Sequence, residues 1–205
     1  MTKLKICGMR SLADLECCRG ADYLGFVVLS DSPRCLGLGR AAELMSCCDR
    51  PTVAVTTETR PQRLRAMARA LEPDVLQLHS PLDREVLESV RDLGVHLWGM
   101  LPVCPGVKVD REALTSVQAL VLDSPGPRAG GSGQVHDWEL SRRLCQEIAP
   151  LPAVLAGGLR PENVRQAMSV VRPFAVDVSS GVEGTGGKDP LRVREMLSKV
   201  RGDED

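Results

Sequence analysis

Three side chains that can transfer protons each close a short apolar segment of this sequence. They are Cys7, His79 and Asp123. An ionised thiol is a base, although its free pKa of about 8.5 means that a nearby positive charge must stabilise the thiolate. A carboxyl group at the end of an apolar run keeps its proton near neutral pH, because desolvation raises its pKa. If Cys7 and Asp123 face each other across one substrate, they form the base and acid of a proton-transfer isomerisation.

Glycine-rich segments offer backbone N–H groups that could bind an anion. Gly157 and Gly158 precede the helix expected near Pro161, and Ser180 and Gly181 follow another apolar segment. One such segment alone is best explained as a tight turn. Several at the same end of a fold instead favour a phosphate site. A third segment, 130–133, could close over a ligand, and we expect its Gly131 and Gly133 to contact the substrate.

The elements that must position these residues alternate between short apolar runs and longer amphipathic stretches. Mostly aliphatic strands that alternate with helices predict a parallel sheet with a helical outer layer. Eight units in 205 residues leave roughly 26 residues per unit, near the lower limit of a closed barrel. A doubly wound sheet would show fewer strands. Strands are expected at 4–7, 23–29, 52–56, 75–79, 96–101, 119–123, 153–156 and 174–178, and helices near Ser11, Arg40, Arg60, Leu82, Asp137, Pro161 and Asp189, with at best a short helix in 102–114.

The fold class predicted is therefore α/β, as a single (β/α)8 TIM barrel of near minimal length. Residues 1–201 are expected to form this one domain, and the acidic tail 202–205 is expected to fray. In such barrels the chemistry lies at the carboxyl ends of the strands and in the loops that follow them. The candidate site residues Cys7, His79 and Asp123 and the glycine-rich segments all fall at those strand ends or in those loops.

The composition excludes several classes of protein. Hydrophobic residues make up 43% of the chain and charged residues 26%, and the formal net charge is −1. No apolar run approaches the length of a membrane span, and the N-terminus does not read as a signal peptide. Five aromatic residues and a balanced charge argue against a nucleic-acid surface. The eight cysteines show no metal-ligand spacing, so we expect no bound metal. Because no secretory signal is recognised, we expect reduced thiols and a cytoplasmic location.

Some candidate site residues have a simpler structural interpretation, and other residues could share their roles. Cys7 could be a small buried apolar residue, since cysteine is among the most buried types. His79 could be a hydrogen-bonded packing residue. Asp177, within another apolar segment, competes with Asp123 for the role of acid or could orient loops, and Arg34 is a cation that could stabilise a thiolate.

Taken together, these residues resemble the phosphoribosylanthranilate isomerase family of tryptophan biosynthesis over nearly the whole chain. Glycine pairs alone would be weak evidence, whereas an ordered series of segments is specific. The series comprises Lys5-Ile6-Cys7-Gly8, segment 20–27 with Ser32-Pro33-Arg34, segment 74–79, Gly130-Gly131-Ser132-Gly133 followed by Asp137-Trp138, Leu155-Ala156-Gly157-Gly158-Leu159 with Pro161-Glu162-Asn163-Val164, segment 176–183, and Lys188-Asp189-Pro190.

The resemblance implies a cofactor-independent Amadori rearrangement of N-(5-phosphoribosyl)anthranilate. We expect the protein to be a monomer or a homodimer. Asp123 would protonate the furanose ring oxygen, and Cys7 would remove the proton from sugar C2. Arg34 would hold the anthranilate carboxylate, and His79 would contact the substrate. The phosphate would lie against Gly157, Gly158, Ser180 and Gly181. With so few aromatic residues, the ring is expected to be held by aliphatic groups, with Phe26 as the nearest aromatic contact.

Some segments depart from the family pattern, and two other functions stay open. The departures are at 54–58, 98–105 and 183–187, which affect the ring pocket and loop details more than the reaction. A related sugar-phosphate isomerase of histidine biosynthesis would more naturally use two aspartates, and Cys7 argues against it. A non-catalytic phosphate-binding barrel would bind phosphate esters without turnover.

Overall fold

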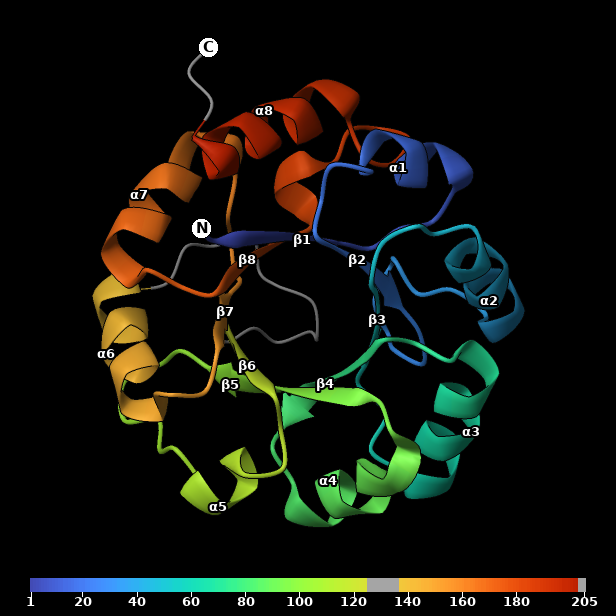
Figure 1. Cartoon of the computed structure of the whole chain (residues 1–205), viewed down its shortest axis with the longest axis vertical. Helices are drawn as coiled ribbons and strands as arrows, with labels where there is room; N and C mark the ends of the chain where they lie inside the picture. Colours follow the sequence, from blue (N-terminus) through green and yellow to red (C-terminus); the bar gives the residue numbers. More distant parts are fainter. Residues whose placement is uncertain (125–136, 203–205) are drawn as a thin grey trace.

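Eight parallel strands form a closed barrel in the computed structural model, which describes residues 1–124 and 137–202. Each strand pairs with the next in the sequence, and the last pairs with the first (Figure 1). This topology confirms the predicted barrel. The strands are β1 Lys3–Cys7, β2 Tyr23–Val27, β3 Thr52–Thr56, β4 Val75–Pro81, β5 His96–Pro102, β6 Ala119–Asp123, β7 Ala153–Leu155 and β8 Ala175–Val178.

Helices surround the strands as an outer ring (Figure 1). None of those in residues 1–124 and 137–202 is long and apolar enough to cross a membrane. The prediction of only a short helix after β5 is confirmed, because α5 has four residues. The helices are α1 Leu12–Cys17, α2 Leu38–Ser46, α3 Pro61–Leu71, α4 Arg84–Val90, α5 Arg111–Leu114, α6 Trp138–Ile148, α7 Pro161–Val171 and α8 Pro190–Arg201, with 3-10 turns at Arg91–Leu93 and Ser180–Val182.

Side-chain caps fix where several helices begin. Ser11 and Asp14 form a capping box at the start of α1, where the sequence predicted a helix. Asp137 and Asp189 accept backbone N–H groups at the starts of α6 and α8. Asp14 also reaches across to the loop after β8, because its Oδ1 accepts the Lys188 N–H at 2.8 Å. This contact fixes Lys188 beneath the mouth of the barrel.

Strand alternation separates the side chains that fill the barrel lumen from those that pack against the helices. The outward-facing residues of β1 and β2, such as Ile6 and Phe26, are buried against the helices. The expectation that Phe26 lies near a bound ring is therefore wrong, because the next residue, Val27, is the one that faces the lumen. Inside the barrel, Cys7 packs with a layer of mostly aliphatic side chains.

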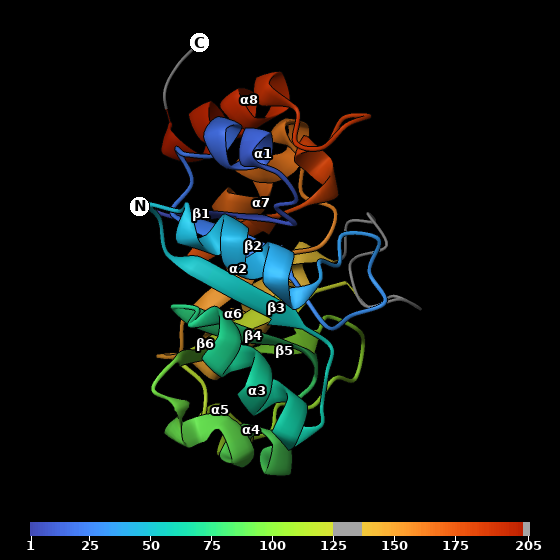
Figure 2. The same ribbon diagram turned by 90° about the vertical axis from the view of Figure 1, so that its right-hand side faces the viewer.

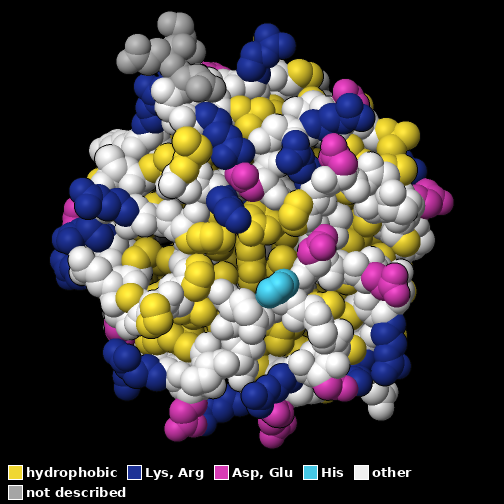
Figure 3. All heavy atoms as spheres, viewed as in Figure 1, with side chains coloured by type: hydrophobic (Ala, Val, Ile, Leu, Met, Phe, Trp, Pro, Cys, Tyr) yellow, Lys and Arg dark blue, Asp and Glu magenta, His cyan; other side chains and the backbone are white. Residues whose placement is uncertain are grey.

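Three aromatic side chains close the barrel at the end where the strands begin. The rings of Tyr23 and Trp98 meet edge to face, with centroids 5.1 Å apart. The Lys3 ammonium lies over the rings of Tyr23 and Phe174, 5.4 and 5.2 Å from their centroids. Hydrophobic side chains occupy the centre of the face in Figure 3, within a surround of charged ones. Tyr23, Trp98 and Phe174 therefore pack together at the end of the barrel where the strands begin.

The opposite end of the barrel carries the longer loops. In Figure 2 the N-terminus lies at one end, and the loop after β2 extends from the other. Because all eight strands are parallel, their carboxyl ends meet at that second end. Side chains from β1, β4, β6 and β8 therefore converge there.

Candidate active site

A cavity opens at the carboxyl ends of the strands. Its volume is about 740 Å³, counting the space open to solvent. Its walls combine aliphatic groups with polar side chains and glycine backbone, the usual character of a small-molecule site. The described residues that line it are Cys7, Val27, Ser30, Ser32, Arg34, Val55, Thr56, Thr57, Gln77, His79, Asp123, Ala156, Gly157, Gly158, Leu159, Asp177, Ser179 and Ser180.

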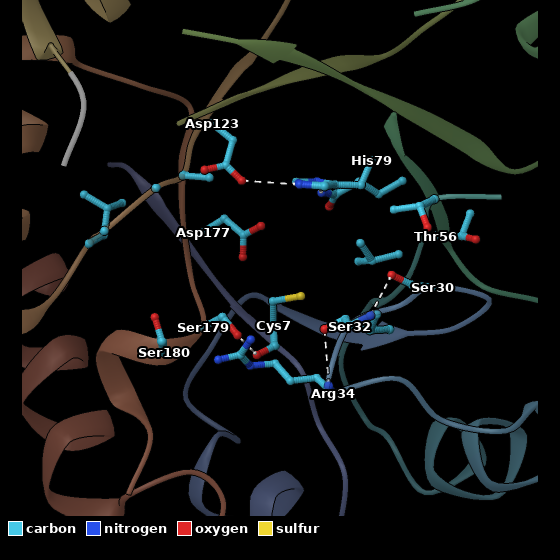
Figure 4. Close-up of a pocket in the computed structure, with 18 residues that line it drawn as sticks. Cys7, Ser30, Ser32, Arg34, Thr56, His79, Asp123, Asp177, Ser179 and Ser180 are labelled. Carbon is cyan, nitrogen blue, oxygen red and sulfur yellow. Dashed lines mark hydrogen bonds and ion pairs between the residues drawn. The ribbon is translucent and has the colours of Figure 1, made fainter. Parts of the chain in front are cut away.

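Cys7 ends β1 with its thiol directed into this cavity (Figure 4). Burial raises the pKa of the Cys7 thiol, although the nearby Lys5 ammonium acts in the opposite direction. Lys188 contributes a weaker effect of the same sign, and its Nζ donates to the Cys7 carbonyl at 2.6 Å. Asp177 acts with burial, so the pKa of the thiol is raised overall, and the two lysines limit the rise. They are the groups that stabilise the thiolate a base requires.

Lys5 is a fully buried cation in the layer below Cys7. It lies two residues earlier on β1, so both side chains face the lumen. The register of β1 and β8 places Lys5 beside Asp177, and its Nζ donates to Asp177 Oδ2 at 2.6 Å. Burial alone would lower the pKa of Lys5, but Asp177 and Cys7 raise it overall, which keeps the ammonium charged.

Asp177 is thereby identified as the partner of a buried cation. A carboxylate that holds an ammonium at 2.6 Å is poorly suited to donating a proton, so Asp177 competes weakly for the acid role. Its second oxygen, Oδ1, is buried and finds no hydrogen-bond partner within the described part of the chain. Because Asp177 lines the cavity, this oxygen is left to accept from a ligand.

Asp123 ends β6 on the side of the cavity opposite Cys7 (Figure 4). Burial raises the pKa of its carboxyl group, while His79 and the Ser124 N–H, which donates to Oδ1 at 2.7 Å, oppose the shift. The carboxyl group therefore retains its proton at higher pH than an exposed aspartate does. That is the property a general acid needs near neutrality.

His79 lies within the same cluster. Its Nε2 is 3.4 Å from Asp123 Oδ2, and its Nδ1 is 3.3 Å from the amide nitrogen of Gln77. Burial lowers the pKa of His79, despite the attraction of the Asp123 carboxylate, so the neutral imidazole is favoured. His79 lines the cavity, as the sequence predicted, and also contacts the candidate acid.

Arg34 lies at the cavity edge in a paired arrangement. Its Nε and Nη2 donate to the two carboxylate oxygens of Glu183 at 2.7 and 2.6 Å. Lys188 also donates to Glu183, at 2.9 Å. Burial tends to raise the pKa of Glu183, but Arg34 and Lys188 outweigh this effect and lower it to about 2. The pairing fixes the guanidinium plane, and no residue of 1–124 and 137–202 accepts a hydrogen bond from Nη1, which can donate to another acceptor.

The loops after β7 and β8 form the remaining wall. Gly157 and Gly158 adopt left-handed conformations, with φ of 81° and 63°, and both line the cavity together with Ser180. Gly181 lies behind this wall, where an added Cβ would be 2.0 Å from the Leu159 carbonyl oxygen. Gly131 and Gly133 lie outside the described residues.

Several charged or polar residues in or beside the cavity were not singled out from the sequence as site residues, among them Lys5, Gln77, Glu183 and Lys188. Lys5 had a usable signal, because alternation places it on the same face of β1 as Cys7. Gln77 had the same relation to His79. Glu183 and Lys188 lie in a loop, where no periodicity indicates which side chains will point inward.

The arrangement brings a candidate base, a candidate acid and an anion-binding wall around one cavity. Among residues 1–124 and 137–202, no group of three or more His, Cys, Asp or Glu side chains is placed to hold a metal ion. The groups present can move protons on a small anionic molecule.

Comparisons with known proteins agree with this chemistry. Residues 4–199 match the family model described as N-(5'phosphoribosyl)anthranilate (PRA) isomerase. The chain is 40% identical to the N-(5'-phosphoribosyl)anthranilate isomerase of Methanothrix thermoacetophila, over 98% of this chain and 99% of the relative. It is 38% identical to isomerase 1 of Methanosarcina mazei, over 98% and 95% of the two chains.

Solved structures give the same result. The phosphoribosyl anthranilate isomerase of Thermotoga maritima superposes with a TM-score of 0.83 at 32% identity, over 98% of this chain and all of that one (100%). A structure of such an isomerase in complex with reduced 1-(o-carboxyphenylamino)-1-deoxyribulose 5-phosphate has a TM-score of 0.80 at 30% identity, with 98% and 100% covered. Another describes monomers generated from the dimeric Thermotoga maritima enzyme, with a TM-score of 0.79 at 28% identity and the same coverage.

The Arg34–Glu183–Lys188 cluster predicts an acid-sensitive contribution to stability. Because the pKa of Glu183 is lowered to about 2 in the folded chain, its contribution is present above the unfolded value of about 4.3 and is lost as the pH falls toward 2. We expect Glu183→Gln to reduce the unfolding free energy by about 1–2 kcal/mol at pH 7 and by much less near pH 2. Urea unfolding across this range measures the difference, and a pH-independent difference would contradict the pairing.

Proposed function

The chain belongs to the N-(5'-phosphoribosyl)anthranilate (PRA) isomerase family, and we propose that Cys7 and Asp123 perform the proton transfers of the reaction in this protein. The reaction is the Amadori rearrangement of N-(5-phosphoribosyl)anthranilate to 1-(2-carboxyphenylamino)-1-deoxyribulose 5-phosphate, a step of tryptophan biosynthesis. It is an aldose–ketose isomerisation, that is, an intramolecular oxidoreduction without a cofactor.

The first step opens the sugar ring. Asp123 gives its proton to the furanose ring oxygen, the bond between that oxygen and C1 breaks, and the anthranilate nitrogen supplies the electron pair that forms a Schiff base. The raised pKa of Asp123 supports this role, because the group must be protonated before the step. The carboxylate left behind faces His79 and the Ser124 N–H.

The second step moves the double bond. The Cys7 thiolate takes the proton from C2, and the electrons of that C–H bond form a C1–C2 double bond while the nitrogen regains its pair. The resulting enolamine tautomerises to the ketone. Lys5 and Lys188 support this role, because they oppose the burial that would keep the thiol protonated.

The remaining residues are proposed to hold the substrate. Arg34 would bind the anthranilate carboxylate through the edge that Glu183 leaves free. His79 would contact the substrate at the cavity wall. The phosphate would accept from the backbone of Gly157 and Gly158 and from Ser180, with Gly181 giving the loop its close approach. Aliphatic side chains that would face the aromatic ring are Val27, Val55, Ala156 and Leu159.

The observation that carries this proposal is the placement of Cys7 and Asp123 on opposite sides of one cavity with the glycine wall beside them. The histidine-pathway alternative would more naturally use two aspartates, whereas β1 ends in Cys7. A non-catalytic barrel would have no need for an acid and a base held across the same space.

Three broader assignments accompany this function. We propose that residues 1–201 act as one barrel domain and that the protein works in the cytoplasm, where eight free thiols would stay reduced. We also propose that it acts as a monomer or a homodimer. The description of monomers generated from a dimeric relative supports both states for this family.

The proposed roles predict strong effects of two conservative substitutions. The purified chain should consume phosphoribosylanthranilate, followed by the loss of substrate fluorescence, and should restore growth to a tryptophan auxotroph that lacks this step. Cys7→Ala and Asp123→Asn should each lower kcat by on the order of 10²–10⁴, the range for a lost acid or base. The exposed Cys35→Ala is the matched control and should leave kcat unchanged.

Two results would overturn these assignments. An inactive wild-type chain that also fails in the auxotroph would exclude the function. Turnover near the wild-type rate in Cys7→Ala or Asp123→Asn would reassign that residue.

Arg34→Ala should act mainly on substrate binding. Removing the guanidinium takes away a charge-assisted contact to the substrate carboxylate, so KM should rise by on the order of 10–100-fold while kcat changes little. Steady-state kinetics with phosphoribosylanthranilate measures both constants, and the exposed Arg19→Ala is the control. A fall in kcat at unchanged KM would place Arg34 in the chemical steps instead.

A further inference from the structure

Gln77 and His79 form a connected pair on β4 that ends at Asp123. They lie two residues apart, so both side chains face the lumen, and both line the cavity. The amide nitrogen of Gln77 is 3.3 Å from His79 Nδ1, and His79 Nε2 is 3.4 Å from Asp123 Oδ2. Figure 4 shows the His79–Asp123 contact spanning the upper side of the cavity.

The chemistry of these atoms determines where the imidazole proton lies. An amide NH2 group only donates, so a Gln77 nitrogen that faces Nδ1 requires Nδ1 to be an acceptor. A neutral imidazole with an unprotonated Nδ1 carries its hydrogen on Nε2. Burial favours the neutral ring. The hydrogen then lies on Nε2, the ring nitrogen that is 3.4 Å from Asp123 Oδ2.

We propose that Gln77 is a positioning residue that holds His79 in the Nε2–H form, so that His79 stabilises the carboxylate produced when Asp123 gives up its proton. This proposal rests on the role of Asp123 as the acid. The proton that moves to the substrate is the one on Asp123, and His79 keeps its own throughout. In the opposite tautomer the Nε2 lone pair would face the new carboxylate and repel it, which would raise the barrier to ring opening.

A second observation supports an active role for the amide. Gln77 is 1% exposed, and its Oε1 is buried without a hydrogen-bond partner among residues 1–124 and 137–202. An unpartnered buried oxygen is unfavourable, so its presence calls for an explanation. If the amide were turned over, Oε1 would accept from Nδ1–H and select the wrong tautomer. A hydroxyl group of the bound sugar phosphate is the donor class that would satisfy Oε1 and lock the amide in the productive orientation.

The tautomer can be observed directly. Two-bond ¹⁵N–¹H correlation spectra distinguish Nε2–H, Nδ1–H and doubly protonated imidazoles, and the chain has only three histidines to assign. We expect His79 to be neutral and protonated on Nε2 at pH 7 in the wild type, and to lose this preference in Gln77→Leu. Protonation on Nδ1, an imidazolium, or an unchanged tautomer in Gln77→Leu would overturn the proposal.

A double-mutant cycle tests the consequence for catalysis. Gln77→Leu should lower kcat about 10-fold or more, because His79 would no longer be held to stabilise a charge that develops in the reaction. It should also raise KM, because Oε1 would no longer accept from the substrate hydroxyl. His79→Gln replaces the ring by an amide that donates without any tautomer to set, so it should retain more activity than His79→Leu. In the His79→Gln background, adding Gln77→Leu should change kcat less than twofold.

The outcomes separate this proposal from the assignment of the acid. An equal loss on adding Gln77→Leu in both backgrounds would indicate a packing role and overturn the proposal. Wild-type turnover in Asp123→Asn would overturn the acid assignment. The tautomer measurement does not depend on turnover and so distinguishes the two failures.

Discussion

Charge buried inside the barrel is the constraint on which the site depends. The Lys5 side chain is fully buried, and its ammonium is compensated by Asp177 at 2.6 Å. Removing one partner of such a pair leaves an uncompensated charge and costs about 3–5 kcal/mol. The pair depends on the β1–β8 register that closes the barrel. The charge arrangement of the site therefore forms only when the barrel closes. Cys7 stands directly above this pair on β1.

Burial alone cannot make an acid and a base from the same cavity. It raises the pKa of both Asp123 and Cys7, which favours a protonated acid but opposes a thiolate. The charged and hydrogen-bonding neighbours oppose burial at both groups, although the pKa of each group stays raised overall. Cys7 has the Lys5 ammonium beside it, whereas Asp123 has a neutral imidazole and a backbone N–H. The proposed base is therefore the group that has a buried ammonium beside it.

Contiguous sequence patterns predicted the barrel and the strand ends, and with them the cavity positions of Cys7 and Asp123. Phe26 was assigned to the wrong face, because one residue of strand phase decides between lumen and helices. Pairings such as Arg34 with Glu183 could not be predicted, since they join residues 149 positions apart through loops without periodicity. Lys5 was predictable in principle from alternation, but its partner depends on how the last strand closes on the first.

The most direct test is the titration of the Asp123 carboxyl group in the folded chain. Selective ¹³C labelling of aspartate Cγ, with Asp123→Asn to assign the signal, gives its pKa by NMR. We expect a midpoint clearly above the ordinary aspartate value of 3.8, because burial raises the pKa more than the nearby His79 lowers it. A midpoint at or below 3.8 would mean that Asp123 is ionised at neutral pH and would contradict its role as the acid.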